Sequence, residues 1–414
     1  MNKRFLYSIL TILVVLIIAG VAIFFVKGYT FSSKDGRLSG TGILSITSMP
    51  DGASVYINGH LTTATNTTLS SLQPKKYQLK IVKEAFIPWE KEVEVVEGLV
   101  TEVKATLFPA IPTIYPLTVN GAINPALSPD GDKLVFAVPF IDDSHSRQKG
   151  GIWVWTMGSQ PISFARGAEP HQLVASSFRL DFSKAKIIWS PDSKQVLLTL
   201  QENNLPGEAN LRNYLLDVDK QTNIADLKDI TPILDTTEKE WALDQKIKDE
   251  ARISTIKDLR IKEIASSSSG LVVGSSLTKT PTPNNEQRTT NLIKWSPDET
   301  KFIKGSKLYD LSSKNTPAKQ TSPAAGKVLL GSKEYDLPPA LDYFWLPDSK
   351  HIILVGEEKI SISEIDGANI SEIYAGKFDG TTVFPWPDSS KMVILTSYNT
   401  STASTPNLFG INLK

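Results

Sequence analysis

A short phrase built around Pro-Asp recurs five times in this 414-residue chain, and it limits the possible folds more than any other feature. In four copies an aromatic residue stands just upstream, and in all five a lysine and an apolar, strand-like run follow. Self-similarity on this scale is typical of an architecture assembled from repeated units. The five pairs are Pro129-Asp130, Pro191-Asp192, Pro297-Asp298, Pro347-Asp348 and Pro387-Asp388.

Each phrase has the chemistry of a β-turn. Proline fixes φ for the second turn position, aspartate bonds to its own backbone, and serine or glycine completes the reversal before the next strand. The five aspartates are also conceivable as a ring of calcium ligands. Calcium sites, however, bring several oxygens within about a dozen residues, so we favour turn capping over metal binding.

Strand, tight turn and strand make half of a propeller blade. Successive prolines of the phrase are 62, 106, 50 and 40 residues apart, whereas one blade takes about 40 to 50 residues. The long gap therefore predicts a degenerate extra copy, with residues 270–274 as its surviving strand, and six blades in total. The last strand, residues 407–413, lacks an outer partner, which residues 114–119 would supply to close the ring.

Part of the long gap has a helical pattern. Residues 238–265 carry charges of both signs and apolar residues at spacings of two to five, and they include neither Gly nor Pro. We interpret this segment as a helical hairpin inserted between blades. It is also the element that we expect to contact another protein.

The chain begins with a long apolar run. Twenty-two uncharged residues, 5–26, lie between basic residues and would span roughly 33 Å as a helix, enough for a hydrocarbon core of about 30 Å. A cleaved signal peptide is the alternative, but its apolar region has only about 7 to 15 residues. We therefore expect residues 1–27 to form a cytoplasmic stub and membrane anchor, residues 28–41 a flexible stalk, and the remainder to be extracytoplasmic.

Residues 42–108 contain about five short alternating strands separated by turn signals, which predict a small β-sandwich. This segment resembles a PEGA domain in Pro50-Asp51-Gly52-Ala53 and in the later Asn58-Gly59 turn. It departs from that family where Lys75 stands in place of the usual Gly, and where Ala85-Phe86 replaces Gly-Tyr. Both departures fall at turns, so the expected fold is unchanged.

The repeated Trp-Ser-Pro-Asp phrase is similar to that of TolB-like propellers over roughly residues 115–414, within a predicted propeller domain of residues 109–414. The expected class is thus all-β: an N-terminal transmembrane helix, a PEGA-like β-sandwich, and a six-bladed propeller with a helical insertion. This combination resembles a type of bacterial envelope protein. The resemblance implies a membrane-tethered surface protein and assigns no catalytic role to any residue.

Composition excludes several chemistries. The absence of cysteine removes disulfides, thiolate nucleophiles and Cys-ligated metal sites, and the balance of 44 acidic and 44 basic residues argues against a nucleic-acid partner. The four histidines are far apart in sequence, and His60 and His351 are expected at the surface. The sequence has no serine-hydrolase elbow and no phosphate-binding loop. We therefore predict no catalytic residue, cofactor or metal site.

Tryptophans are the remaining candidates for binding. Trp153 and Trp155 share one face of a predicted strand, where they fill the core between blades or form a carbohydrate-stacking surface. The core is favoured, because blade interfaces need large apolar residues. Trp89, after Pro88, is the single aromatic residue that we select as a candidate ligand contact.

These observations predict a single-pass, non-catalytic binding or scaffold protein of the bacterial cell envelope. Its expected partner is a wall polysaccharide or another envelope protein. The alternative is a hydrolase or lyase with its active site in the central channel of the propeller. That alternative requires acidic or histidine side chains to converge at one end of the channel.

Overall fold

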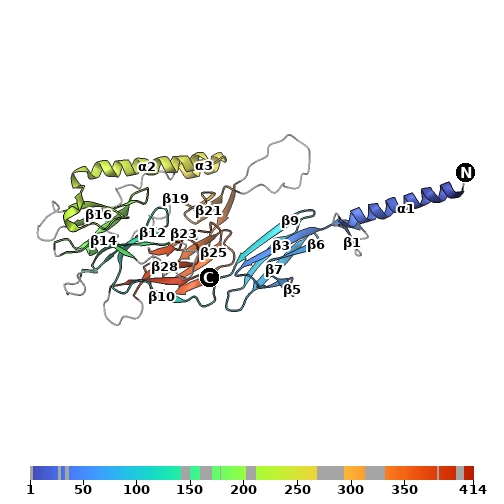
Figure 1. Cartoon of the computed structure of the whole chain (residues 1–414), viewed down its shortest axis with the longest axis horizontal. Coiled ribbons are helices and arrows are strands. Elements are labelled where there is room, and N and C mark those ends of the chain that lie inside the picture. The colour runs from blue at the N-terminus through green and yellow to red at the C-terminus, as the bar shows by residue number, and fades with distance from the viewer. Residues whose placement is uncertain are drawn as a thin grey trace. The chain divides into compact units, whose positions relative to one another are not determined.

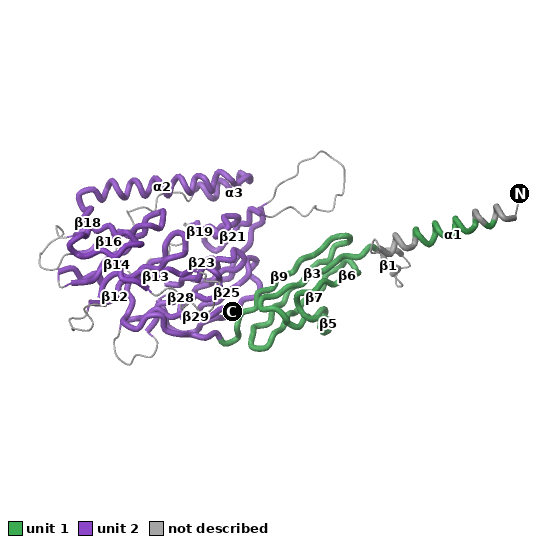
Figure 2. Tube along the Cα trace, in the orientation of Figure 1, with its two compact units in different colours: residues 1–111, 414 green, residues 112–413 purple. Residues whose placement is uncertain are grey.

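The computed structural model divides the chain into two compact units (Figure 2), residues 1–111 with 414 and residues 112–413. It describes residues 3–26, 29–32, 37–140, 150–158, 170–177, 179–201, 211–267, 293–312, 332–379, 382–397 and 405–414. The second unit begins directly after the proline-spaced connector around Pro109.

The first unit starts with helix α1 (Lys3–Val26), followed by a short hairpin of β1 (Tyr29–Ser32) and β2 (Arg37–Gly40). Where the sequence predicts a flexible stalk, the structure therefore has two paired strands, with Tyr29 opposite Gly40. Over the described residues, no helix combines the length and the hydropathy needed to cross a membrane.

The rest of the first unit is a two-layer β-sandwich. One layer has the order β6-β3-β9 and the other β5-β4-β7-β8, and β3 pairs with β9 in parallel. The strands are β3 (Gly42–Met49), β4 (Ser54–Ile57), β5 (His60–Ala64), β6 (Thr67–Leu72), β7 (Lys76–Val82), β8 (Trp89–Glu94) and β9 (Val100–Thr106).

Alternating side chains of these strands fill the core between the layers. Tyr77, Leu79 and Ile81 of β7 are buried while Gln78 and Lys80 between them are exposed, as the period of two dictates. Trp89 belongs to the same core and is only 4% exposed. The prediction that Trp89 contacts a ligand is therefore wrong in this structure, because the ring is packed against the apolar residues of both layers.

The second unit contains five antiparallel sheets of four strands each, which we number as blades. Blade 1 has β11 (Ile123–Leu127), β12 (Lys133–Val138), β13 (Gly151–Thr156) and β14 (His171–Ala175). Blade 2 has β15 (Lys186–Trp189), β16 (Gln195–Gln201), β17 (Leu211–Asp217) and β18 (Lys228–Asp229). Blade 3 has β19 (Ile293–Trp295), β20 (Lys301–Lys304), β21 (Lys307–Asp310) and β22 (Lys333–Asp336).

Blade 4 has β23 (Asp342–Trp345), β24 (His351–Val355), β25 (Lys359–Glu364) and β26 (Ser371–Ala375). Blade 5 combines β27 (Val383–Pro385), β28 (Lys391–Thr396) and β29 (Asn407–Asn412) with β10 (Ile114–Pro116). The predicted closure is confirmed, because β10 is the outer strand beside β29 and joins the start of the unit to its end.

The described residues form five blades, whereas the sequence predicts six. After β18 the long gap holds helices α2 (Leu234–Ser254) and α3 (Leu259–Ser266), in the region of the predicted helical insertion. Residues 270–274, expected as the strand of a further blade, lie outside the described part of the chain. In Figure 1, α2 and α3 lie along the side of the unit where β16 and β21 are labelled.

Neighbouring blades share apolar cores. One core joins blades 1 and 2, a second joins blades 5 and 1, and a third joins blades 3 and 4. A separate core packs Ile253 and Ile261 of the two helices against Phe302 and Tyr309 of blade 3. The helices are thus attached to blade 3 by apolar contacts, whereas their contact with blade 2 is polar.

Candidate binding site

The five Pro-Asp turns share one backbone conformation. Each joins the innermost strand of a blade to the next strand, and the residue after Asp has φ in the left-handed region. This conformation costs about 1 to 2 kcal/mol for a residue with a Cβ atom, a cost that glycine avoids. The five positions are Gly131 at 80°, Ser193 at 61°, Glu299 at 56°, Ser349 at 57° and Ser389 at 57°.

The aspartates hold these turns together. In blade 2 the Ser190 hydroxyl donates to Asp192 at 2.6 Å, and Asp192 accepts the Lys194 backbone N–H at 3.1 Å. The hydrogen bond from Ser190 lowers the pKa of Asp192. In blade 3 burial raises the pKa of Asp298, but hydrogen bonds from Ser296 and Thr300 outweigh it and bring the value to about 2. The described residues contain no cluster of three acidic or histidine side chains that could hold a metal ion.

Blade 4 stabilises its turn differently. Leu346 replaces the serine of blades 1 to 3, and the His351 ring donates from Nδ1 to Asp348 Oδ2 at 2.6 Å. His351 is only 5% exposed, so the prediction of a surface histidine is wrong. The reason is that its ring supplies the hydrogen-bond donor that a serine hydroxyl supplies in blades 2 and 3.

Two contacts recur between neighbouring blades. The Trp189 indole N–H of blade 2 donates to the Ala126 carbonyl oxygen of blade 1 at 2.9 Å, and Trp345 of blade 4 donates to Lys294 of blade 3 at 2.8 Å. At the same junctions the hydroxyls of Ser193 and Ser349 each accept a backbone N–H of the preceding turn at 3.1 Å. The two donors are Asp130 N and Asp298 N.

The junction between blades 2 and 3 lacks both contacts. Glu299 occupies the position of Ser193 and Ser349, so no hydroxyl is available to the blade 2 turn. The equivalent tryptophan is Trp295, whose indole N–H has no hydrogen-bond partner among the described residues and whose ring is only partly buried. It packs against Phe302 of its own blade, with ring centroids 5.2 Å apart.

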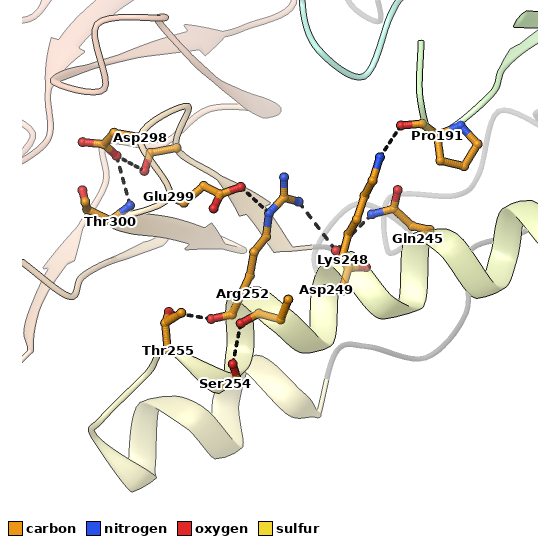
Figure 3. A network of polar contacts seen from close by, with 12 residues as sticks. Pro191, Gln245, Lys248, Asp249, Arg252, Ser254, Thr255, Asp298, Glu299 and Thr300 are labelled. Carbon is orange, nitrogen blue, oxygen red and sulfur yellow. Dashed lines mark hydrogen bonds and ion pairs between the residues drawn. The ribbon is translucent and has the colours of Figure 1, made fainter. Parts of the chain in front are cut away.

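Helix α2 spans this junction instead (Figure 3). Its Lys248 ammonium donates to the Pro191 carbonyl oxygen of blade 2 at 2.6 Å, and its Arg252 Nε donates to Glu299 of blade 3 at 2.7 Å. One turn of helix thus holds the turns of two blades, because side chains four residues apart lie on the same face.

Further contacts within α2 orient the Arg252 side chain. Asp249 approaches Arg252 at 3.7 Å and accepts from Gln245 at 3.0 Å, which positions the guanidinium between two carboxylates. Near the start of α2, burial lowers the pKa of Lys186 on blade 2, and the Glu238 carboxylate partly offsets this effect. We call Lys248, Arg252 and Glu299 the α2 bridge.

A cavity of about 1080 Å³ lies between α2 and the turns of blades 1, 3, 4 and 5. Its walls combine proline and tryptophan from the turns, including Trp295 and Trp345, with polar side chains of α2. A second hollow, of about 690 Å³, lies between α2 and the turns of blades 1, 2 and 3. The concave, partly aromatic lining with a few charged groups is typical of binding sites.

Of the four carboxylates that line the larger cavity, those of Asp130, Asp249 and Glu299 have partners within the structure. Asp130 accepts the Asp132 backbone N–H within its own turn, whereas Asp249 and Glu299 both contact Arg252. The lining contains no histidine. The alternative of a hydrolase or lyase with its active site in the central channel stays a prediction.

The other sequence candidates lie elsewhere. Trp155 packs edge-on against Trp386, with centroids 5.7 Å apart, in the core between blades 1 and 5, and Trp153 packs beside it. Trp155 therefore lies in the core, and Trp153 is partly buried against it. His60 and His171 are exposed, and His145 lies outside the described residues.

The α2 bridge and the place of Trp295 in the lining of the cavity were not predicted from the sequence. One signal was available, because Glu299 is the only charged residue at the fourth position of the five turns. A charge at a position that otherwise carries Ser or Gly indicates a partner from outside the repeat.

Comparison with known proteins assigns residues 41–111 to the PEGA domain, so the chain carries a PEGA domain there. A search of the curated proteins gives no match. Among solved structures the chain is similar to TolB from Agrobacterium tumefaciens at 13% identity and TM-score 0.21, covering 70% of this chain and 78% of that chain. It is similar to TolB from Acinetobacter baumannii at 13% identity and TM-score 0.21, covering 82% of this chain and 60% of that chain.

A gluconolactonase from Xanthomonas campestris is also similar, at 13% identity and TM-score 0.23, covering 73% of this chain and 90% of that chain. These similarities are too distant to bear on function. The propeller architecture rests on the topology of the five sheets and on their closure by β10.

Proposed function

We propose that this chain is a membrane-anchored, extracytoplasmic binding or scaffold protein of the bacterial cell envelope, without catalytic activity. The observation that carries the binding role is the cavity of about 1080 Å³, where side chains of four blades and α2 meet. Its partner is an envelope protein or a wall polysaccharide, since proline, tryptophan and mixed charges suit an extended polar ligand.

The anchor is supported by α1. Its described side chains form a run of exposed large apolar residues, which water does not favour and a lipid bilayer does. The run comprises Leu10 and the seven residues 12–18. We propose that the basic residues before α1 keep the N-terminus in the cytoplasm, with the PEGA domain and the propeller outside.

Photo-cross-linking in intact cells tests the binding role. A photoreactive amino acid replaces Lys246, which lines the cavity, and in a matched variant it replaces Glu357, an exposed residue of the β24–β25 turn at the opposite end of blade 4. We expect a discrete cross-linked product from position 246 and none from position 357. Treatment of the product with a protease or a muramidase separates a protein partner from a wall polysaccharide.

Identical products from the two positions would contradict a binding role for the cavity. Location is tested independently, by extraction of membranes with alkaline carbonate and by protease access to the propeller in spheroplasts. A chain that is released by carbonate, or that stays protected in spheroplasts, would contradict the anchored, extracytoplasmic topology.

A further inference from the structure

The PEGA domain has two distinct ends, which the strand register defines. At the end that follows α1, Gly42 lies opposite Leu72, Ile43 opposite Val100, and Lys76 opposite Glu94. The turns 58–59, 73–75 and 95–99 therefore gather there, and we call this the proximal end. Residues 50–53, 83–88 and 107–110 lie at the opposite, distal end, which leads into the propeller unit.

The β1–β2 hairpin brings the proximal end close to α1. Tyr29 is three residues beyond Val26 and lies opposite Gly40, so the chain returns to its starting point before the sandwich begins. Three extended residues reach about 10 Å and neighbouring strands lie about 5 Å apart. The proximal end therefore lies within about 20 Å of the end of α1.

The proximal end exposes apolar side chains. In the turn between β8 and β9, Val96 is 40% exposed and Leu99 57%, and Val100 at the start of β9 is 56% exposed. The turn is firmly held, because the Gly98 N–H donates to the Thr41 carbonyl oxygen at 3.0 Å and the Ile43 N–H donates to Leu99 at 3.0 Å. Three large apolar side chains are thus presented on a rigid turn, where polar residues would suit water better.

Basic side chains border this turn. Lys75 and Lys76 are exposed at the same end, where the Val95 N–H donates to the Lys75 carbonyl oxygen at 3.0 Å. Lys76 is paired with Glu92, and Lys75 lies 5.0 Å above the Tyr77 ring. Exposed apolar residues beside lysines are typical of surfaces that meet lipid headgroups.

We propose that the proximal end of the PEGA domain rests on the lipid bilayer, with Val96, Leu99 and Val100 in the interface. The inference depends on the proposed function, because α1 as an anchor brings this end to the membrane. Lipid is the partner because the short path from α1 keeps the apolar turn within reach of the headgroup region. Glu94 lies opposite Lys76 and Glu97 lies between Val96 and Leu99, so apolar insertion contributes most of the contact and added salt changes it little.

The absence of cysteine makes the test direct. The full chain carries a single cysteine labelled with an environment-sensitive fluorophore and is reconstituted into vesicles of phosphatidylethanolamine and phosphatidylglycerol. Leu99→Cys probes the proximal end. Met49→Cys, 54% exposed at the distal end, is the matched control, and Leu16→Cys, 65% exposed on α1, reports the anchor.

Lipids bearing a nitroxide quencher give the readout. We expect at least twofold stronger quenching at position 99 than at position 49, with strong quenching at position 16. Equal quenching at positions 99 and 49, with position 16 quenched, would overturn the inference and leave the anchor intact. No quenching at position 16 would overturn the anchor itself, and the inference with it.

Discussion

At the scale of single residues, the fourth position of the repeated turn decides how each blade meets the next. Ser193 and Ser349 accept a backbone N–H from the preceding turn, whereas Glu299 accepts from Arg252 of α2. Ser389 has the same φ but no hydrogen bond to its hydroxyl among the described residues. One turn conformation thus supports two different contacts, and in blade 5 it has neither of them.

Ser193→Ala should lower the free energy of unfolding by about 1 kcal/mol, because the Asp130 N–H loses its acceptor. Ser389→Ala is the matched control, with the same strained backbone and no lost bond, and should change stability by less than about 0.5 kcal/mol. Urea denaturation measures both. Equal effects would show that the hydroxyl bond between blades contributes nothing.

The Asp348 carboxyl should make the free energy of unfolding depend on pH in the acidic range. Burial raises its pKa, but the hydrogen bond and charge of His351 outweigh burial, so the net pKa lies below the ordinary 3.8. The folded state therefore gains stability above about pH 4 and loses it as pH falls through the lowered pKa. Melting temperature against pH should fall more steeply for the natural chain than for Asp348→Asn. Parallel curves would refute the assignment.

At the scale of elements, α2 connects blades 2 and 3. Direct hydrogen bonds between blades make the corresponding connection between blades 1 and 2 and between blades 3 and 4. The apolar side chains of α2 pack on blade 3, and Lys248 and Arg252 reach the turns of blades 2 and 3. The helix therefore covers a junction that has no tryptophan bond and no serine bond of its own. It also forms one wall of the cavity, so binding and ring integrity involve the same element.

A double-mutant cycle on Arg252→Ala and Glu299→Ala should give a coupling of about 0.5 to 1 kcal/mol, since the pair is partly exposed.

Hydrogen exchange of the backbone amides at 192–195 should accelerate in Lys248→Ala. Lys246→Ala, whose ammonium pairs only within the helix, serves as the control and should leave exchange unchanged. Similar exchange in both variants would count against the bridge.

At the scale of the whole molecule, closure depends on a strand from the beginning of the propeller unit. β10 pairs with β29, and the Asn407 side chain accepts from Thr118 Oγ at 3.0 Å and from the Gly121 N–H at 2.9 Å. Nearly 300 residues separate these partners in sequence. Such a contact couples the first and last blades into one folding unit.

Asn407→Ala should therefore cost about 2 kcal/mol, because two donors at the closure lose their acceptor. Asn412→Ala, on the same strand, removes a side chain that makes no hydrogen bond among the described residues, and should cost less than about 0.5 kcal/mol. Urea denaturation followed by tryptophan fluorescence compares them. Equal midpoints would show that the Asn407 contacts do not contribute to closure.

Much of the fold could be predicted from the sequence, because its signals are local. Asp192 and Asp298 cap turns using donors within two or three residues, and β7 alternates as a two-residue period requires. The closing strand could also be predicted, since the last blade lacked a partner. The burial of Trp89 and His351 could not, because it depends on which distant residues pack around them.

The sequence by itself determined the repeated turn, the β-sandwich pattern and the presence of a helical insertion, since each is encoded within a short stretch of chain. Only the tertiary structure decided that the described blades number five, that Glu299 pairs with a helix, and that Trp295 faces a cavity. The physical reason is that the hydrogen bonds between blades join residues more than 50 positions apart. A turn motif specifies its own hydrogen bonds, whereas its neighbour in space is chosen by how the whole ring closes.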